Sequence, residues 1–143
     1  MIMVIGIIGE SCTGKTTIVN ELKKHIDITV FQGKDYLKLD KNPKNAELKF
    51  VKLLNEADDR IIVYVITEKS HLAFLPSDSK KVLVQEELEV IKDRFSKRMN
   101  GFLPKPVEMM LEKKHGMFDH INYDLVIKSE TLEEKVSKIL EVI

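Results

Sequence analysis

Eight consecutive residues near the start of the chain, GESCTGKT from Gly9 to Thr16, match the phosphate-loop pattern G-x-x-x-x-G-K-[ST] at every fixed position. Gly9 and Gly14 allow the backbone to curl so that successive N–H groups point inward, where they can hold a phosphate. Lys15 can reach the β- and γ-phosphates of a nucleotide, and the Thr16 hydroxyl can ligate Mg²⁺. The motif therefore predicts a binding site for a nucleoside triphosphate, which we expect to be ATP with Mg²⁺.

The elements on either side of the motif are those that a phosphate loop requires. The run MIMVIGII over residues 1–8 is almost unbroken in its apolar character, as expected of a parallel strand buried on both faces. The segment TIVNELKKH over residues 17–25 has apolar residues at helical spacing. A chance glycine-rich turn is the alternative, but it would not explain the lysine and hydroxyl that follow. The residues expected to contact the nucleotide are Gly9, Glu10, Ser11, Cys12, Thr13, Gly14, Lys15, Thr16 and Thr17.

Strand-like and helix-like segments alternate along the rest of the chain. Strands are predicted at residues 1–8, 28–31, 60–67, 80–85 and 123–128, and helices at 17–25, 45–55, 86–98, 105–115 and 131–142. Thr131 and Glu134 form a capping-box pattern at the start of the last helix. The order predicts an α/β fold of the P-loop NTPase type: a doubly wound parallel sheet of about five strands with helices on both faces, in a single domain over residues 1–143. The site should lie at the carboxyl ends of the strands.

Composition narrows the class of protein. The chain has 143 residues, no formal net charge and one cysteine. Zero net charge gives no reason to expect a broad nucleic-acid or membrane surface. The lone cysteine excludes an internal disulfide and suits a reducing compartment. The apolar start is too short to cross a membrane and runs into the phosphate loop, so it is not a signal peptide. We therefore expect a cytoplasmic enzyme, monomeric or homodimeric, with neither nucleic acid nor membrane as partner.

A phosphate loop directly after the first strand, in a chain this short, resembles the small-molecule P-loop kinases: nucleoside monophosphate kinases, shikimate kinase and gluconate kinase. The segment KKVLVQEELEVIKDRFSKRM over residues 80–99 resembles their strand, helix and basic lid. The segment FDHINYDLVIKSETLEEKVSKIL over residues 118–140 resembles the terminal strand and helix of guanylate kinases, so within these families the chain most resembles guanylate kinases. The resemblance implies transfer of the γ-phosphoryl group of ATP to a small acceptor, with GMP as one candidate.

A basic cluster lies on the helix predicted over 86–98. Arg94 and Arg98 are four residues apart and project from one helical face, and Asn100-Gly101 follows as a hinge. By analogy with the resembling kinases, residues 92–105 form a lid whose two arginines close over the triphosphate and stabilise charge during transfer. The alternative is a solvated cationic helix face.

The resemblance also implies roles for three residues that follow predicted strands. Asp35 would lie near the acceptor and the metal, as a base or a Mg²⁺ ligand; its alternative is an ordinary turn aspartate. Glu68 stands at the end of the third strand, where many P-loop proteins hold the metal, and is a second candidate metal ligand. The segment 128–130 would pack beside the adenine, which adds Ser129 to the nucleotide contacts.

One departure leaves the acceptor open. Guanylate kinase grips its monophosphate with arginines and tyrosines, but the matching stretch, residues 36–59, contains no arginine. Its lysines are point charges rather than bidentate forks. Two other classes therefore remain: a nucleotide switch of the ATPase or GTPase kind, and an ATP-binding protein that has lost transfer. The [NT]-K-x-D motif that usually reads guanine is absent from the sequence.

Overall fold

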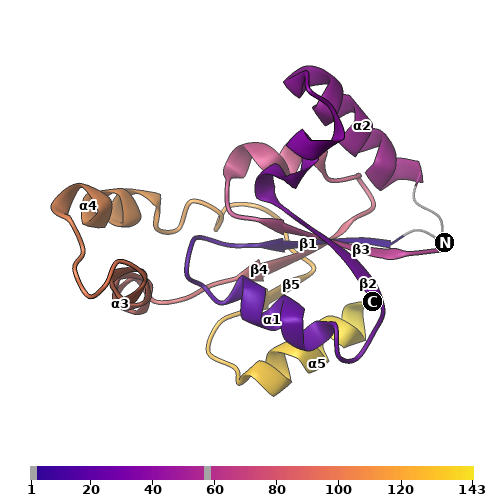
Figure 1. Ribbon diagram of the computed structural model, residues 1–143. Helices are drawn as coiled ribbons and strands as arrows, with labels where there is room; N and C mark the ends of the chain where they lie inside the picture. Colours follow the sequence, from indigo (N-terminus) through magenta and orange to yellow (C-terminus); the bar gives the residue numbers. More distant parts are fainter. Residues whose placement is uncertain (1–2, 57–58) are drawn as a thin grey trace.

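The computed structural model describes residues 3–56 and 59–143, and a five-stranded parallel sheet lies at its centre. The strands are β1 (Met3–Ile8), β2 (Ile28–Gln32), β3 (Ile61–Ile66), β4 (Lys80–Val84) and β5 (Leu125–Ile127). They lie in the order β2-β3-β1-β4-β5 (Figure 1). The predicted parallel sheet is confirmed. Residues 1–2 of the first predicted strand, and residues 57–58 of the arginine-free stretch, lie outside the described residues.

The predicted helices are present with small shifts at their ends. They are α1 (Lys15–Leu22), α2 (Pro43–Glu56), α3 (Leu88–Arg98), α4 (Lys105–Lys114) and α5 (Leu132–Val142). Helix α1 starts two residues before the predicted 17–25, directly after Gly14, and α5 begins with the predicted capping box. Strand β5 is shorter than the predicted 123–128 and pairs with β4 through Leu125, Val126 and Ile127.

Two short 3₁₀ helices were not predicted: η1 (Gly33–Leu39) after β2, and η2 (Lys69–Phe74) after β3. Neither has the apolar spacing of an α-helix, so the sequence pattern does not reveal them. At the start of η1, the Asp35 carboxylate accepts a hydrogen bond from the Gln32 N–H at 2.9 Å. Both 3₁₀ helices follow the carboxyl ends of strands, so they matter for the site.

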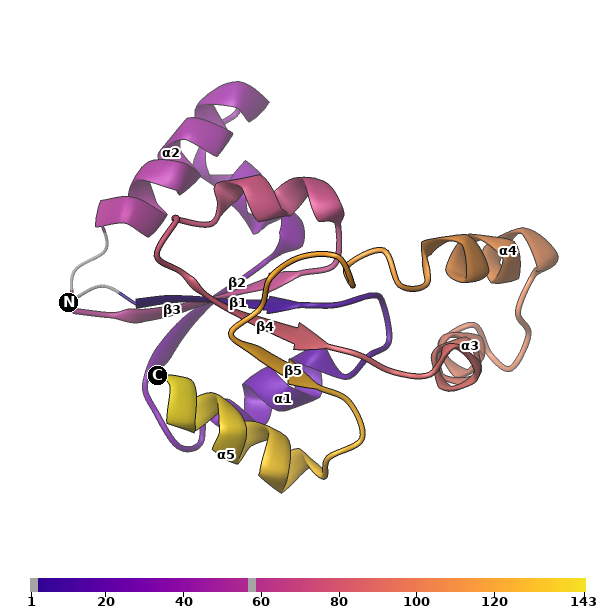
Figure 2. The same cartoon turned by 180° about the vertical axis from the view of Figure 1, so that it is seen from behind.

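Alternate residues of β1 supply the two halves of the core. Ile5 and Ile7 pack in the half that contains α1 and α5, whereas Val4 and Ile8 pack in the half that contains α2. Figures 1 and 2 show the same layers, with α1 and α5 on one face of the sheet and α2 on the other. Because β1 pairs with both β3 and β4 and is covered on both faces, its sequence is a continuous apolar run.

Strand register brings three loops to one edge of the sheet. Ile8 pairs with Ile66, and the Gly9 N–H donates to the Ile66 carbonyl at 3.1 Å, so the phosphate loop starts beside the end of β3. Gln32 pairs with Val65, which places the end of β2 next to them. Helices α3 and α4 extend from this same edge (Figure 2). No helix among the described residues is long and apolar enough to span a membrane.

Candidate active site

The phosphate loop has the backbone conformation that its sequence predicts. Gly14 has a φ of 97° and caps α1, whose first residue is Lys15. A Cβ atom on Gly9 would lie 2.5 Å from the Val84 carbonyl oxygen, so only glycine fits there. Cys12 also has a positive φ, 64°, which is uncommon for a residue with a side chain. The loop therefore curls tightly into the amino end of α1, where N–H groups without helical partners favour an anion.

Lys15 lies inside this curl. Its side chain is buried, and Nζ donates to the carbonyl oxygens of Gly9 and Glu10 at 2.6 Å each. Burial is the main cause that lowers the pKa of Lys15 to about 8. The charge of Arg98 acts in the same direction, and the Glu10 carboxylate acts in the opposite one. An anion in the loop would supply the negative charge that the buried ammonium lacks.

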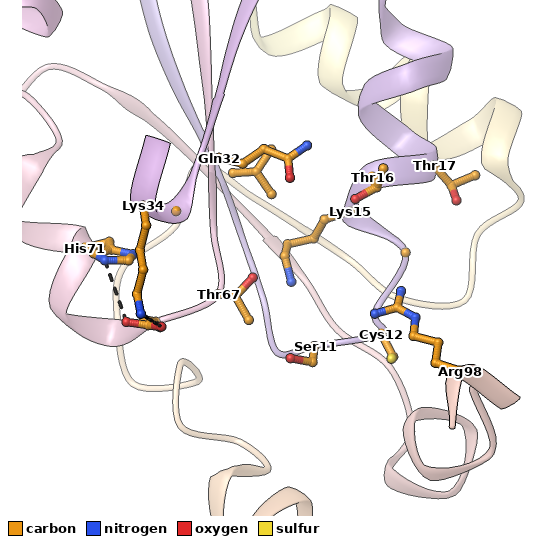
Figure 3. A pocket seen from close by; sticks show the side chains of 14 residues that line it. Ser11, Cys12, Lys15, Thr16, Thr17, Gln32, Lys34, Thr67, His71 and Arg98 are labelled. Atoms are coloured by element: carbon orange, nitrogen blue, oxygen red, sulfur yellow. Dashed lines mark ion pairs between the residues drawn. The ribbon is translucent and has the colours of Figure 1, made fainter. Parts of the chain in front are cut away.

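A cleft of about 410 Å³ opens in front of the loop at the carboxyl edge of the sheet. Figure 3 shows the loop along one side, Gln32, Lys34 and His71 on the opposite side, and Arg98 entering from α3. The residues that line it are Ser11, Cys12, Gly14, Lys15, Thr16, Thr17, Gln32, Gly33, Lys34, Val65, Thr67, Glu68, His71 and Arg98. The cleft thus combines most of the predicted nucleotide contacts with one of the two predicted lid arginines.

The wall opposite the phosphate loop carries a charged cluster. Glu68 lies 4.0 Å from the Lys34 ammonium and 3.7 Å from Nε2 of His71 (Figure 3). The Glu68 and Lys34 side chains are half or more exposed, whereas His71 is 4% exposed. Nδ1 of His71 has no hydrogen-bond partner among the described residues. Glu68 is the only acidic residue among those that line this cleft in the described structure.

Aromatic packing fixes this wall. The His71 ring stacks on Phe74 with centroids 5.8 Å apart and meets the edge of Tyr36 at 5.9 Å. The Tyr64 hydroxyl donates to the Gly33 carbonyl at 2.8 Å, which ties β3 to the start of η1. Burial raises the pKa of the Tyr64 hydroxyl well above its usual value, so the group remains a donor. The positions of Lys34, Glu68 and His71 therefore depend on contacts between β3, η1 and η2.

Asp35, our candidate base or metal ligand, lies outside the lining of this cleft. One carboxylate oxygen accepts from the Gln32 N–H, and the other lies 3.8 Å from the Lys38 ammonium. This is the geometry of the alternative we gave, a turn aspartate. Its neighbours Gln32 and Lys34 face the cleft instead, because Asp35 turns back to cap η1.

The two lid arginines make different contacts. Arg98 lines the cleft, and also a second cleft of about 350 Å³ on the far side of the loop. Arg94 lines only the second cleft, and its Nη1 donates to the Cys12 carbonyl at 2.9 Å. The second cleft is lined by Cys12, Thr13, Gly14, Thr17, Ile18, Arg94, Arg98, Leu132 and Lys135.

Ser129 lies exposed in the turn after β5 and lines neither of these two clefts. The last helix approaches the loop through Leu132 and Lys135 instead, one to two turns further along the chain. Sequence reasoning missed both residues, and it missed Gln32 and Lys34. The signal for Gln32 and Lys34 was their place directly after a strand; Leu132 and Lys135 had no local signal.

Thr16 and Glu68, two of the predicted metal ligands, line the same cleft, whereas Asp35 does not. The described residues contain no cluster of three or more His, Cys, Asp or Glu side chains that could hold a metal by themselves. The donor set is therefore sparse, a threonine hydroxyl and one carboxylate. Such a set fits Mg²⁺ that is held largely by water and by the phosphates of a nucleotide.

No family model matches the sequence, and no curated protein matches it significantly. Solved structures match almost the whole chain. Shikimate kinase from Aquifex aeolicus is 21% identical with a TM-score of 0.59, over 98% of this chain and 95% of that one. A gluconokinase from Sinorhizobium meliloti is 13% identical with a TM-score of 0.63, over 97% and 90%. The YorR protein from Bacillus subtilis, solved with phosphorylated GDP, is 18% identical with a TM-score of 0.67, over 98% and 95%.

The chain has the fold of a small P-loop kinase. At these identities the likeness concerns the fold alone, and it confirms the predicted P-loop architecture with its five-stranded parallel sheet. It favours the shikimate and gluconate kinase side of the predicted resemblance and gives no support to the guanylate kinase side.

Proposed function

We propose that this protein is an ATP-dependent phosphotransferase that passes the γ-phosphoryl group to a small anionic acceptor. One observation carries the proposal. A single cleft joins the phosphate loop, with Lys15 and Thr16, to a separate polar wall that contains Lys34, Glu68 and His71. Nucleotide binding needs only the first group, and the second group, with the exposed cation Lys34, supports a separate acceptor site. The kinase fold of the structures similar to this chain is consistent with the proposal.

On the nucleotide side, Lys15 leaves the carbonyls of Gly9 and Glu10 and holds the β- and γ-phosphates. Arg98 contacts the phosphates from the side of α3, where developing charge is best stabilised by a fixed donor. Thr16 would hold Mg²⁺ through its hydroxyl, and Glu68 would act as the base. When bound, Mg²⁺ would neutralise phosphate charge.

On the acceptor side, Glu68 accepts the proton of the attacking hydroxyl or phosphate oxygen. His71, held by its aromatic neighbours, lies 3.7 Å from that carboxylate and borders the same space. Lys34 is an exposed cation with no task on the nucleotide, and its pairing with Glu68 at 4.0 Å is weak. Lys34 therefore selects acceptors that carry a carboxylate or a phosphate.

The second cleft receives the nucleotide base. Ile18 and Leu132 offer apolar surface there, and Arg94, Arg98 and Lys135 are its charged residues. Guanine presents N–H donors that need an acceptor such as a carboxylate, and no acidic side chain is among the lining residues of the described structure. ATP is accordingly the preferred donor over GTP. This reason is separate from the missing guanine motif.

The test is ADP release from ATP with Mg²⁺, measured against three sets of acceptors: sugar acids and hydroxy acids, nucleoside monophosphates including GMP, and neutral polyols. We expect release that depends on an acceptor from one of the first two sets. Selection between those two sets would identify the anion that Lys34 recognises. Release that no acceptor stimulates would favour the alternative of a nucleotide switch, and nucleotide binding without any release would indicate lost transfer.

A further inference from the structure

Cys12 has a backbone conformation that disfavours side chains, yet its side chain packs against two helices. Its φ is 64° and it is 5% exposed. It packs against Ile91 of α3 and Leu111 of α4, at the centre of an apolar cluster separate from the two halves of the sheet core. The partly buried members of that cluster are Leu88, Phe95, Leu103 and Val107. The phosphate loop is thus attached through its fourth residue to α3, which carries part of the predicted lid, and to α4.

A hydrogen bond and an ion pair strengthen this attachment. Nη1 of Arg94 donates to the Cys12 carbonyl at 2.9 Å, and Nη2 lies 3.4 Å from a carboxylate oxygen of Glu86. The Glu86 side chain is 15% exposed, so it holds the guanidinium in a partly desolvated position. Arg94 is therefore occupied on both of its terminal nitrogens by groups of this chain.

A second contact ties the other end of the helical pair to the loop. The Glu10 carboxylate accepts from the Gly116 N–H at 3.1 Å and lies 3.0 Å from Nδ1 of His115, both just after α4. Helices α3 and α4 are thus connected to the loop at Glu10 and at Cys12, on either side of Ser11.

The Cys12 carbonyl that Arg94 holds also determines the direction of a neighbouring N–H group. A trans peptide plane points its C=O and the next N–H in opposite directions, so a fixed Cys12 carbonyl also fixes the Thr13 N–H. That N–H is one of the backbone groups a phosphate loop offers to its ligand. Arg98, one helical turn along, has no hydrogen bond of this kind to the loop among those described, and it faces both clefts.

We propose that Arg94 is a positioning residue, which holds the phosphate loop in its phosphate-binding conformation through the Cys12 carbonyl, while Arg98 is the arginine that contacts the nucleotide. The role for the loop rests on the proposed nucleotide binding, but the attachment itself does not require a ligand. Arg94 and Arg98 then have separable functions, although the sequence presents them as an equivalent pair.

The single cysteine of the chain provides a direct test in the ligand-free protein. The rate at which a thiol reagent labels Cys12 is compared for wild type, Arg94→Ala, Arg94→Lys and Glu86→Gln. Arg98→Ala and Lys97→Ala serve as controls for loss of a positive charge from the same helix. Thermal unfolding confirms that each variant is folded, which we expect because Arg94 is 43% exposed.

We expect Arg94→Ala to raise the labelling rate by about tenfold or more, because the loop opens more often. Arg94→Lys should restore part of the protection, Glu86→Gln should lose part of it, and both controls should stay within about twofold of wild type. Equal labelling of Arg94→Ala and wild type would overturn the attachment. An equal increase in Arg98→Ala would overturn the difference between the two arginines.

Calorimetry with Mg-ADP and Mg-ATP then tests what the attachment does. Arg94→Ala should weaken both nucleotides by a similar factor, about tenfold, because a displaced loop loses contacts common to both. Arg98→Ala should change kcat more than either affinity. Unchanged affinities in an Arg94→Ala variant that labels faster would refute the positioning role. If wild type bound no nucleotide, the proposed function would fail, while the labelling rates would still decide the attachment.

Discussion

The two walls of the cleft are built in different ways. On the proposed nucleotide wall, all lining residues except Arg98 come from one short segment, residues 11–17, whose curled backbone presents N–H groups. The proposed acceptor wall comes from the ends of β2 and β3 and the residues after them, and its groups are side chains: Gln32, Lys34, Glu68 and His71. The first wall is set by local backbone conformation, and the second by packing between distant segments.

The two walls therefore differ in how directly the sequence encodes what they would bind. Backbone N–H groups can bind any phosphate, so the proposed nucleotide wall needs only a short motif. The proposed acceptor wall instead depends on individual side chains held by the packed rings of Tyr36, Phe74 and His71, so no short motif specifies it. The predictions below test each wall in turn.

Lys15→Ala should have the largest effect on activity. In the proposed function its ammonium holds the β- and γ-phosphates, so we expect kcat to fall by about 10³-fold or more. Steady-state kinetics against Lys23→Ala, an exposed lysine just beyond the same helix, provides the control. Similar losses in the two variants would mean that the loop lysine does not act on the nucleotide.

Glu68→Gln tests the acceptor wall. Loss of the base should lower kcat by about 10²- to 10³-fold, with little change in the KM for ATP, because the nucleotide contacts lie on the other wall. A variant with a normal kcat would assign the proton transfer to another group.

The stability of the ligand-free protein should depend on pH through Lys15. Its pKa is about 8 in the folded protein and 10.5 without burial, so between these values the unfolded state binds more protons and stability rises with pH. Below pH 8 the charged side chain costs about 3 kcal/mol, which Lys15→Met removes. Urea unfolding from pH 7 to pH 10.5 should show the difference between variant and wild type shift by that amount. A difference that is constant with pH would contradict the depressed pKa.

Asp35→Asn should have the smallest effect and serves as the matched carboxylate for Glu68. Its carboxylate caps η1 rather than facing the cleft, so we expect a loss of about 0.5–1 kcal/mol in stability and a nearly normal kcat. Thermal unfolding and steady-state kinetics measure the two. A fall in kcat like that of Glu68→Gln would return Asp35 to the role that the family resemblance implied.

Much of the fold was predictable because its signals are local and strong. The apolar runs of β1 and β3 reflect burial on both faces, and the start of α5 has its capping box in four residues. The 3₁₀ helices η1 and η2 were missed because segments of seven and six residues with three residues per turn lack the 3.6-residue apolar spacing that reveals an α-helix. Because η1 was not predicted, the sequence also did not show that Lys34 faces the cleft while Asp35 turns back to cap η1.

The sequence by itself determined the phosphate loop, because glycines, a lysine and a hydroxyl at fixed spacing create the backbone curl in which the lysine and hydroxyl lie. Only the tertiary structure decided which groups stand opposite the loop, because Lys34 of η1 lies beside Glu68, and Tyr36 of η1 and Tyr64 of β3 pack against His71. It also separated Arg94 from Arg98. Two arginines on one helical face look alike in sequence, and their contacts differ because one of them meets the Cys12 carbonyl 82 residues away.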